Sequence, residues 1–263
     1  MTAPELLKQV HLEDGRTISY ARLGDPGGWP ALYFHGFPGS RLEPLPVHDA
    51  AARGGAQLIA IDRPGFGHSS PKPGRRILDW PDDVAAFADG LGLDRFAVIG
   101  VSGGGPYAAA SALRIPERLT SVAIVCGVAP FQVPEATRGM MRSNRILFGL
   151  ARYAPLLVRL LFAWTARGLR KDPERFIEKM ARELPEPDRI ALERPEVREA
   201  FLASPEQAFR QGTRSCVEEA RLYAGPWGFQ LEDIRMSVSL FQGERDVNVP
   251  ASMGRYQALA IPD

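Results

Sequence analysis

The 263 residues of the chain are enough to bury a sizeable hydrophobic core. With 45% hydrophobic and 24% charged residues, the composition is that of an ordinary soluble protein. A formal net charge of +1, without basic residues interleaved with aromatic ones, argues against nucleic acid as a partner. The cysteines, Cys126 and Cys216, lack metal-type spacing, so we expect buried thiols and no metal site. The start of the chain has no apolar run long enough for a signal peptide, which favours a cytoplasmic protein.

Strand and helix patterns alternate along the first 130 residues. "QVHLED" and "RTISYARLG" flank Asp14-Gly15, a dipeptide typical of hairpin turns. Further strands are predicted at 31–34, 57–62, 95–101 and 122–127, with helical stretches between them. This alternation predicts an α/β fold with a mainly parallel sheet and helices on both faces.

The pattern changes between about 131 and 235, where helical periodicity, many arginines and repeated prolines replace the strands. A strand followed by an acidic turn returns in "SVSLFQGERDVNVP", residues 237–250. We therefore predict a core formed by 1–130 and 236–263 and a helical insertion over 131–235.

One apolar stretch, "ILFGLARYAPLLVRLLFAWTARGL" (146–169), has the length of a membrane span, but Arg152, Pro155 and Arg159 interrupt it. An arginine near the centre of a bilayer costs at least ~2.5 kcal/mol on insertion scales. An amphipathic pair of helices split at Pro155 is therefore favoured. Contact with a membrane surface is the less favoured alternative, so a membrane is not expected as a partner.

The pentapeptide Gly100-Val101-Ser102-Gly103-Gly104 fits the pattern G-x-S-x-G between a β-branched strand and a small-residue helix. A tight turn there would lift Ser102 clear of the sheet edge, and glycines at 100 and 104 allow the chain to fold that sharply. The helix that follows directs backbone N–H groups at the same point. Ser102 is thus a candidate nucleophile, and the Gly103 N–H a candidate donor to an oxyanion.

A second glycine-containing loop, "HGFPG" (35–39), follows the strand predicted at 31–34. Such a loop can turn backbone N–H groups inward, and Phe37 N–H is the predicted partner of Gly103 N–H. The alternative is that the loop is only a tight turn.

Taken together and in this order, "HGFPGSR", "DRPGFGHSS", "GVSGGGPYAAA" and "GERDVNVP" resemble the α/β-hydrolase fold family. The resemblance places the predicted 131–235 insertion where that family carries its cap, and it implies a small-molecule substrate and no cofactor. It implies that Asp246 is the acid of a catalytic triad, with Glu244 as a weaker candidate. A serine nucleophile argues against the branches of the family that use aspartate. For Asp62 a structural role at the glycine-rich loop is preferred.

The base of the triad is missing from the sequence. The family places its residues in the order serine, acid, histidine, but no histidine follows Asp246. The four histidines, at 11, 35, 48 and 68, all precede Ser102. His35 is expected to brace the oxyanion loop, and His68 is a remote candidate for a substitute base. The family pattern would continue with a final strand, a Gly-His loop and a closing helix, so we expect a chain truncated before these elements.

The expected function is hydrolysis of a small ester or related acyl substrate by Ser102 through an acyl-enzyme, with the 263-residue chain itself inactive for lack of the histidine. The alternative is a natural non-catalytic relative that binds a ligand or a partner. The oligomeric state stays open. An apolar substrate is favoured by aromatic residues and leucines of the insertion: Phe148, Tyr153, Leu157, Phe162 and Trp164. The alternative is that these side chains only form the core of the cap.

Overall fold

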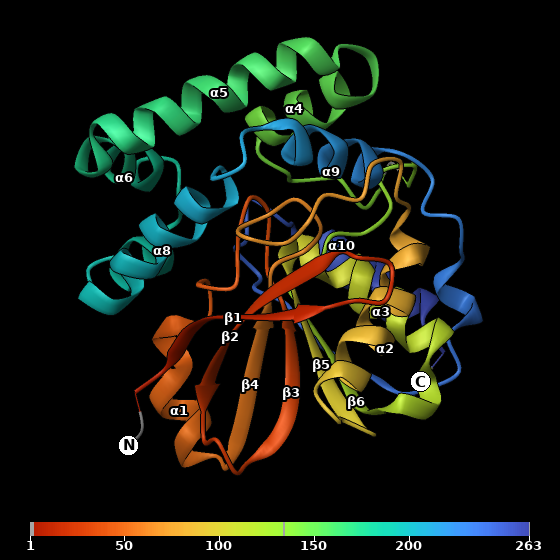
Figure 1. Ribbon diagram of the computed structural model, residues 1–263. Coiled ribbons are helices and arrows are strands. Elements are labelled where there is room, and N and C mark those ends of the chain that lie inside the picture. Colours follow the sequence, from red (N-terminus) through yellow and green to blue (C-terminus); the bar gives the residue numbers. More distant parts are fainter. Residues whose placement is uncertain (1–2, 134, 263) are drawn as a thin grey trace.

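A single seven-stranded sheet forms the centre of the computed structural model, which describes residues 3–133 and 135–262 (Figure 1). The strand order is β1-β2-β4-β3-β5-β6-β7. Only β2 runs antiparallel to its two neighbours, and the other pairs are parallel. The strands are β1 (Glu5–His11), β2 (Thr17–Gly24), β3 (Trp29–Phe34), β4 (Ala56–Ile61), β5 (Phe96–Val101), β6 (Leu119–Val125) and β7 (Val238–Phe241). The predicted mainly parallel α/β sheet is confirmed.

The predicted hairpin joins β1 and β2. Gly15 has a φ of 82°, which a residue without a Cβ adopts freely. The turn is closed by a 2.8 Å hydrogen bond from Leu12 N–H to the carbonyl of Arg16.

Successive side chains of the central strands point to opposite faces of the sheet, so the core is divided between the two faces. On one face, Leu32 and Phe34 pack in a large apolar cluster with residues of α2 (Trp80–Gly90) and α3 (Gly105–Arg114). On the other, Ala31 and Tyr33 belong to a smaller cluster beside α1 (His48–Arg53). Because the strands are buried on both faces, their sequences read as nearly continuous apolar runs. A further helix, α10 (Ala251–Ala260), follows β7.

Between β6 and β7 the described residues of the chain form helices and no strand. These helices make a layer beyond one end of the sheet (Figure 1). They are α4 (Arg142–Tyr153), α5 (Pro155–Lys171), α6 (Pro173–Ala181), α7 (Glu186–Ala191), α8 (Pro195–Ala208) and α9 (Arg214–Ala224). The predicted division of a helical pair at Pro155 is confirmed, because α4 ends at Tyr153 and α5 begins at Pro155.

Of the two cysteines, only Cys216 is buried as predicted. Cys126 is only partly buried and has a φ of 47°, in the left-handed region. The expectation of a buried thiol was wrong there, because the chain turns sharply as it leaves β6 and brings the residue to the edge of the sheet.

Candidate active site

Ser102 follows β5 directly, at a turn that the chain makes before α3. Its φ of 51° lies in the left-handed region, which is rare for a residue with a side chain. Such a conformation costs about 1–3 kcal/mol and persists only where the surrounding structure holds it. Residues 102–104 form one turn of 3-10 helix that leads into α3. The backbone at Ser102 is thus the sharp strand-to-helix turn that the sequence predicts.

The glycines on either side of Ser102 allow this turn by close packing. A Cβ on Gly104 would overlap the carbonyl oxygen of Phe34, at the end of β3. One on Gly100 would lie 2.6 Å from Gly104 O and 2.7 Å from the Cβ of Ala108. Larger residues at either position would therefore push α3 away from the sheet.

Phe37 and Gly103, the predicted oxyanion donors, lie side by side. A Cβ on Gly103 would come within 2.8 Å of the Phe37 Cβ. Gly103 lies in the first turn of its helix, where backbone N–H groups have no partner within the helix and carry a partial positive charge. The Phe37 ring packs against Phe162 and Tyr223, at 5.7 and 5.5 Å between ring centroids, which fixes the loop under α5 and α9.

His35 is fully buried and braces this loop. Its Nε2 accepts the Arg63 N–H at 3.2 Å, and its Nδ1 lies 2.8 Å from the carbonyl of Gly36. Burial, and then the charge on Arg63, hold the pKa of His35 well below its usual range. A neutral His35 that donates through Nδ1 and accepts through Nε2 satisfies both contacts, which leaves neither nitrogen for a proton from Ser102.

A buried network of charges, which sequence analysis missed, connects the two segments that contain the predicted oxyanion donors to α9. The guanidinium of Arg63 donates to the carbonyls of His35 and Gly36. Its Nε also pairs with Glu219 at 2.6 Å. The hydroxyl of Tyr223 lies 2.8 Å from both Glu219 Oε1 and the carbonyl of Gly103. One turn of α9 thus contacts the carbonyl of Gly103 through Tyr223. The same turn holds Arg63, which donates to the carbonyls of His35 and Gly36, through Glu219.

The other oxygen of Glu219 completes the network. Oε2 accepts from Arg75 at 2.6 Å and from the hydroxyl of Tyr107 at 2.8 Å. Burial alone would raise the pKa of Glu219, but the charges on Arg63 and Arg75 outweigh it and lower the pKa to about 2. The carboxylate is therefore ionised at neutral pH and balances two buried arginines.

Ser102 opens into a cavity of about 470 Å³ that lies between the sheet and the α4–α9 layer. Its wall is mostly apolar, with Leu147 and Phe148 from α4, Phe176 and Met180 from α6 and Phe201 from α8. The polar groups in the wall are those of Ser102, Glu43, Asn144, Ser204, Tyr223 and Asn248. Its size suits a small organic molecule.

Of the five apolar residues expected to face a substrate, only Phe148 lines this cavity. Phe162 is buried against Phe37, while Tyr153, Leu157 and Trp164 face outward and are exposed. The expectation was wrong for these four. Leu157, Phe162 and Trp164 belong to α5, which has apolar residues on two faces, and the sequence does not indicate which one packs inward. Tyr153 is the last residue of α4.

Glu43, also missed in the sequence, is the acidic residue of the cavity wall. Its carboxylate accepts the Gly36 N–H at 2.8 Å and the hydroxyl of Tyr33 at 2.8 Å. Burial raises its pKa, although these hydrogen bonds oppose the effect. A Cβ on Gly36 would lie 3.1 Å from Glu43 Oε2 and 3.4 Å from the Cβ of Ser102, so Gly36 separates the acid from the serine.

Asp246 lies in the loop after β7, as predicted. Its Oδ1 accepts the N–H groups of Asn248 and Val249 at 2.8 and 2.9 Å, and both of these residues line the cavity. The neighbouring Cys126 has its pKa raised by burial and by the charge on Asp246. Asp188 of α7 has its pKa raised by burial and by the same charge. Asp246 is thus hydrogen-bonded to two residues of the cavity wall, whereas Glu244 is exposed.

None of the four histidines lines the cavity with Ser102. His68 lies in the loop after β4, where burial and then the charges on Arg210 and Arg41 lower its pKa. Its backbone N–H lies 3.4 Å from Asp62. Asp62 also accepts the N–H of Arg41 at 2.7 Å, so its structural role extends to the loop after β3.

In the part of the chain that the structure describes, no three His, Cys, Asp or Glu side chains gather as a metal site. Nor does any helix of this part combine the length and the hydropathy that crossing a bilayer requires.

Comparison with known proteins gives one family match. The sequence model described as "alpha/beta hydrolase fold" matches residues 30–191. Solved structures of other proteins match 97% of the chain. One is an esterase, RhEst1, from Rhodococcus sp. ECU1013, with a TM-score of 0.67 and 20% sequence identity, matched over 87% of that chain. Another is a hydrolase from Pseudomonas aeruginosa PA01, with a TM-score of 0.68 and 18% sequence identity, matched over 86% of that chain.

Curated relatives match parts of the sequence. The acetyltransferase component of the acetoin cleaving system of Cupriavidus necator is 38% identical over 157 residues, which is 57% of this chain and 39% of that protein. The 2-hydroxymuconate semialdehyde hydrolase of Pseudomonas putida is 32% identical over 131 residues, 48% of this chain and 45% of that protein. Each match therefore spans less than half of the relative's length.

Proposed function

The chain belongs to the α/β-hydrolase fold family, and from the geometry around Ser102 we propose that it is built as a serine hydrolase for small, largely apolar esters or related acyl compounds. The observation that carries the proposal is the left-handed Ser102 beside the paired residues Phe37 and Gly103, at the wall of an apolar cavity. Relatives named as hydrolases and esterases support the reaction class.

In the proposed reaction, the Ser102 hydroxyl attacks the carbonyl carbon of the substrate as a base takes its proton. The N–H groups of Phe37 and Gly103 hold the negative oxygen of the tetrahedral intermediate. Losing one such donor typically costs about 2.7–4 kcal/mol of transition-state stabilisation. The alcohol leaves with a proton, and water then releases the acid from the acyl-enzyme.

Asp246 would orient a histidine and stabilise its charged form. We assign no residue to the role of that histidine, because residues 247–263 contain none and the four histidines present do not line the cavity. We propose that α4–α9 act as a cap that closes the substrate cavity, since three of these helices supply much of its apolar wall. The chemistry of the proposed groups calls for no cofactor.

A second candidate function is that of a non-catalytic member of the family that binds a small apolar ligand in the same cavity, since the cavity wall with Ser102 is mostly apolar and holds none of the four histidines. The two differ in whether Ser102 reacts.

We expect a fluorophosphonate probe to label Ser102 in the 263-residue chain, slowly but well above the other serines. The oxyanion donors stabilise the transition state even without a base. Mapping the labelled peptide by mass spectrometry tests this, with Ser102→Ala as the blank and Ser204→Ala, a change at another serine of the cavity wall, as the matched control. Labelling that survives in Ser102→Ala would remove the nucleophile assignment.

A further inference from the structure

The outward face of α5 is apolar and exposed. Leucines and Trp164 recur there at intervals of three and four positions, the spacing of one helix face. Leu156 is 74% exposed, Leu160 67% and Trp164 66%. The opposite face of α5 packs inward through Val158, Phe162, Ala166 and Leu169. In Figure 1, α5 runs along the outside of the helical layer, away from the sheet. We call the exposed residues 156, 157, 160, 161 and 164 of α5 the α5 stripe.

The chain segment that carries the stripe has charge of one sign. Residues 138–171 contain eight arginines and lysines and no aspartate or glutamate, although the whole chain has a net charge of only +1. All eight are exposed, and they are Arg138, Arg142, Arg145, Arg152, Arg159, Arg167, Arg170 and Lys171. Of these eight, Arg159, Arg167, Arg170 and Lys171 belong to α5 and line the grooves beside the stripe.

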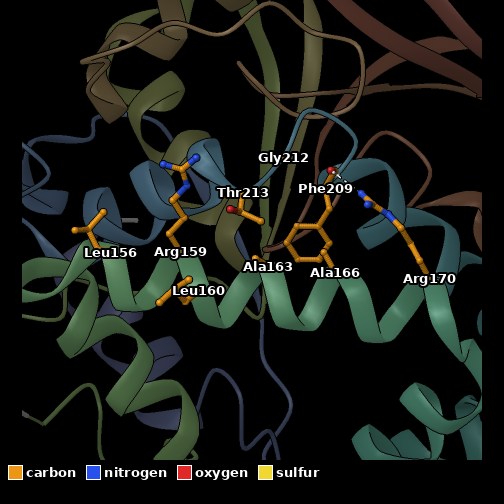
Figure 2. Close-up of a pocket in the computed structure, with 9 residues that line it drawn as sticks. All are labelled: Leu156, Arg159, Leu160, Ala163, Ala166, Arg170, Phe209, Gly212 and Thr213. Atoms are coloured by element: carbon orange, nitrogen blue, oxygen red, sulfur yellow. Dashed lines mark hydrogen bonds between the residues drawn. The ribbon is translucent and has the colours of Figure 1, made fainter.

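Along one flank of α5, two of these arginines border a groove of about 620 Å³. Figure 2 shows Arg159 and Arg170 extending from the same side of the helix, on either side of Phe209. Arg170 donates to the carbonyl of Phe209 at 3.1 Å. The groove thus places cationic groups next to the exposed Leu156 and Leu160.

A second groove, of about 660 Å³, lies between α5 and α6 at the end of the stripe. Four cationic residues line it, Arg167, Lys171, Arg175 and Lys179, against one acid, Asp172. The ammonium of Lys179 lies 4.8 Å from the centre of the Trp164 ring. Asp172 accepts the backbone N–H of Arg175, so its carboxylate is already engaged in capping α6. The exposed acids of α6 are Glu174 and Glu178.

We propose that the α5 stripe docks on an anionic membrane surface, with its leucines and Trp164 in the interfacial region and the surrounding cations on lipid phosphates. A helix with leucine and tryptophan on one side and arginine and lysine beside them binds in this way, lying in the membrane plane. Each cation close to an anionic bilayer adds about 1 kcal/mol of attraction, or roughly fivefold in affinity. This proposal takes up the contact with a membrane surface that the sequence analysis gave as the less favoured alternative.

The same charges argue against two other occupants. A second copy of the chain that met this face through a two-fold axis would bring its Arg159, Arg167, Arg170 and Lys171 against the same four cations, which repel. Nucleic acid would neutralise the arginines but would leave the leucines of the stripe in water.

Docking would also hold the Ser102 cavity near the lipid. Leu147 and Phe148 of α4 and Phe176 and Met180 of α6 line that cavity, and these helices adjoin α5. Delivery of an acyl substrate from the membrane rests on the proposed hydrolase function, whereas docking itself does not.

The test is binding of the 263-residue chain to phosphatidylcholine vesicles with and without phosphatidylglycerol, by co-sedimentation at physiological salt. We expect binding to the anionic vesicles and at least tenfold weaker binding to the neutral ones. Leu156→Asp with Leu160→Asp, and separately Arg167→Gln with Lys171→Gln, should each reduce binding at least tenfold. These side chains are exposed, so the fold should survive the changes.

Matched controls separate this surface from the rest of the molecule. Leu6→Asp with Leu7→Asp places the same charges on exposed leucines of β1 and should leave binding unchanged. The blue shift of tryptophan fluorescence on docking should be lost in Trp164→Phe and kept in Trp29→Phe, since Trp29 is 54% exposed on the sheet. Ser102→Ala should bind like the original chain, so a failed nucleophile assignment would not affect this result.

Equal binding to neutral and anionic vesicles, no binding to either, or anionic binding that both α5 double variants retain would overturn the proposal. So would a dimer in light scattering that Leu156→Asp with Leu160→Asp dissociates while vesicle binding is absent, because a second copy would then be the occupant.

Discussion

Replacing Glu219 with alanine is expected to lower the free energy of unfolding by about 3–5 kcal/mol, the range for breaking a buried ion pair from one side. The Glu219 side chain is fully buried and pairs with Arg63 and Arg75, each at 2.6 Å. Without it, two buried guanidinium groups lose their counter-charge and the hydroxyls of Tyr107 and Tyr223 lose an acceptor. Urea denaturation at pH 7 measures the change.

The neighbouring Glu218 provides the matched control. It lies on the same helix, pairs with Arg75 at 3.2 Å and is 24% exposed at its side chain. Glu218→Ala is expected to change the free energy of unfolding by no more than about 1 kcal/mol, as for other pairs that reach water. Equal losses in the two variants would show that Glu219 does not hold the network together.

The stabilisation by the Glu219 charge should depend on pH in a defined direction. Because the paired arginines lower the pKa of Glu219 to about 2 in the folded chain, its charge stabilises the fold above the pKa of an unfolded glutamate, 4.5. That contribution is lost as the pH falls from there toward 2. The difference in unfolding free energy between the original chain and Glu219→Gln should be constant from pH 7 to 5 and shrink below. A difference that grew on acidification would contradict the assignment.

The parts of the fold that follow from the sequence depend on local rules. Asp14-Gly15 fixes a hairpin because glycine reaches positive φ, and short apolar runs separated by helical stretches specify a parallel sheet. The turn at Ser102 is equally local, since Gly100 and Gly104 must be small for β5 and α3 to meet. Such features need no knowledge of distant residues.

The buried network could not be predicted in the same way. Arg63 and Glu219 are 156 positions apart, and nothing in the adjacent pair Glu218-Glu219 indicates which side chain reaches water. One sequence pattern could have helped. Cys216, Ala220 and Tyr223 form a helix face with Glu219, and an acid on a mostly apolar face suggests a buried partner.

The sequence pattern of α5 likewise did not indicate which face of the helix packs inward. Leucine and aromatic residues occupy both of its faces, and only tertiary packing selects Val158 and Phe162 for the interior and Leu156 and Leu160 for the surface. The absence of acids over 138–171 was visible in the sequence, and read together with the apolar stripe it would have pointed to an anionic partner.

Added imidazole is expected to raise the rate at which the 263-residue chain hydrolyses p-nitrophenyl acetate by at least tenfold at neutral pH. A positioned general base contributes typically about 10²–10⁴-fold, and none of the chain's histidines lines the Ser102 cavity. Without a base, only the proposed oxyanion donors and substrate binding would act, which would leave a rate roughly 10³–10⁴ times that in water. The cavity of about 470 Å³ has room for imidazole beside a short acyl group.

Imidazole also hydrolyses this ester by itself, so the quantity that matters is the rate that Ser102→Ala removes. That difference should rise with imidazole concentration and with pH through the pKa of imidazole, because only the neutral form accepts a proton. N-methylimidazole, which keeps the accepting nitrogen, should serve as well, whereas imidazolium at low pH should not. A high Ser102-dependent rate without imidazole would show that the chain already contains a base. His68→Ala and Glu43→Gln would then identify it: Glu43 shares the cavity wall with Ser102, and a base at His68 would require the loop after β4 to move.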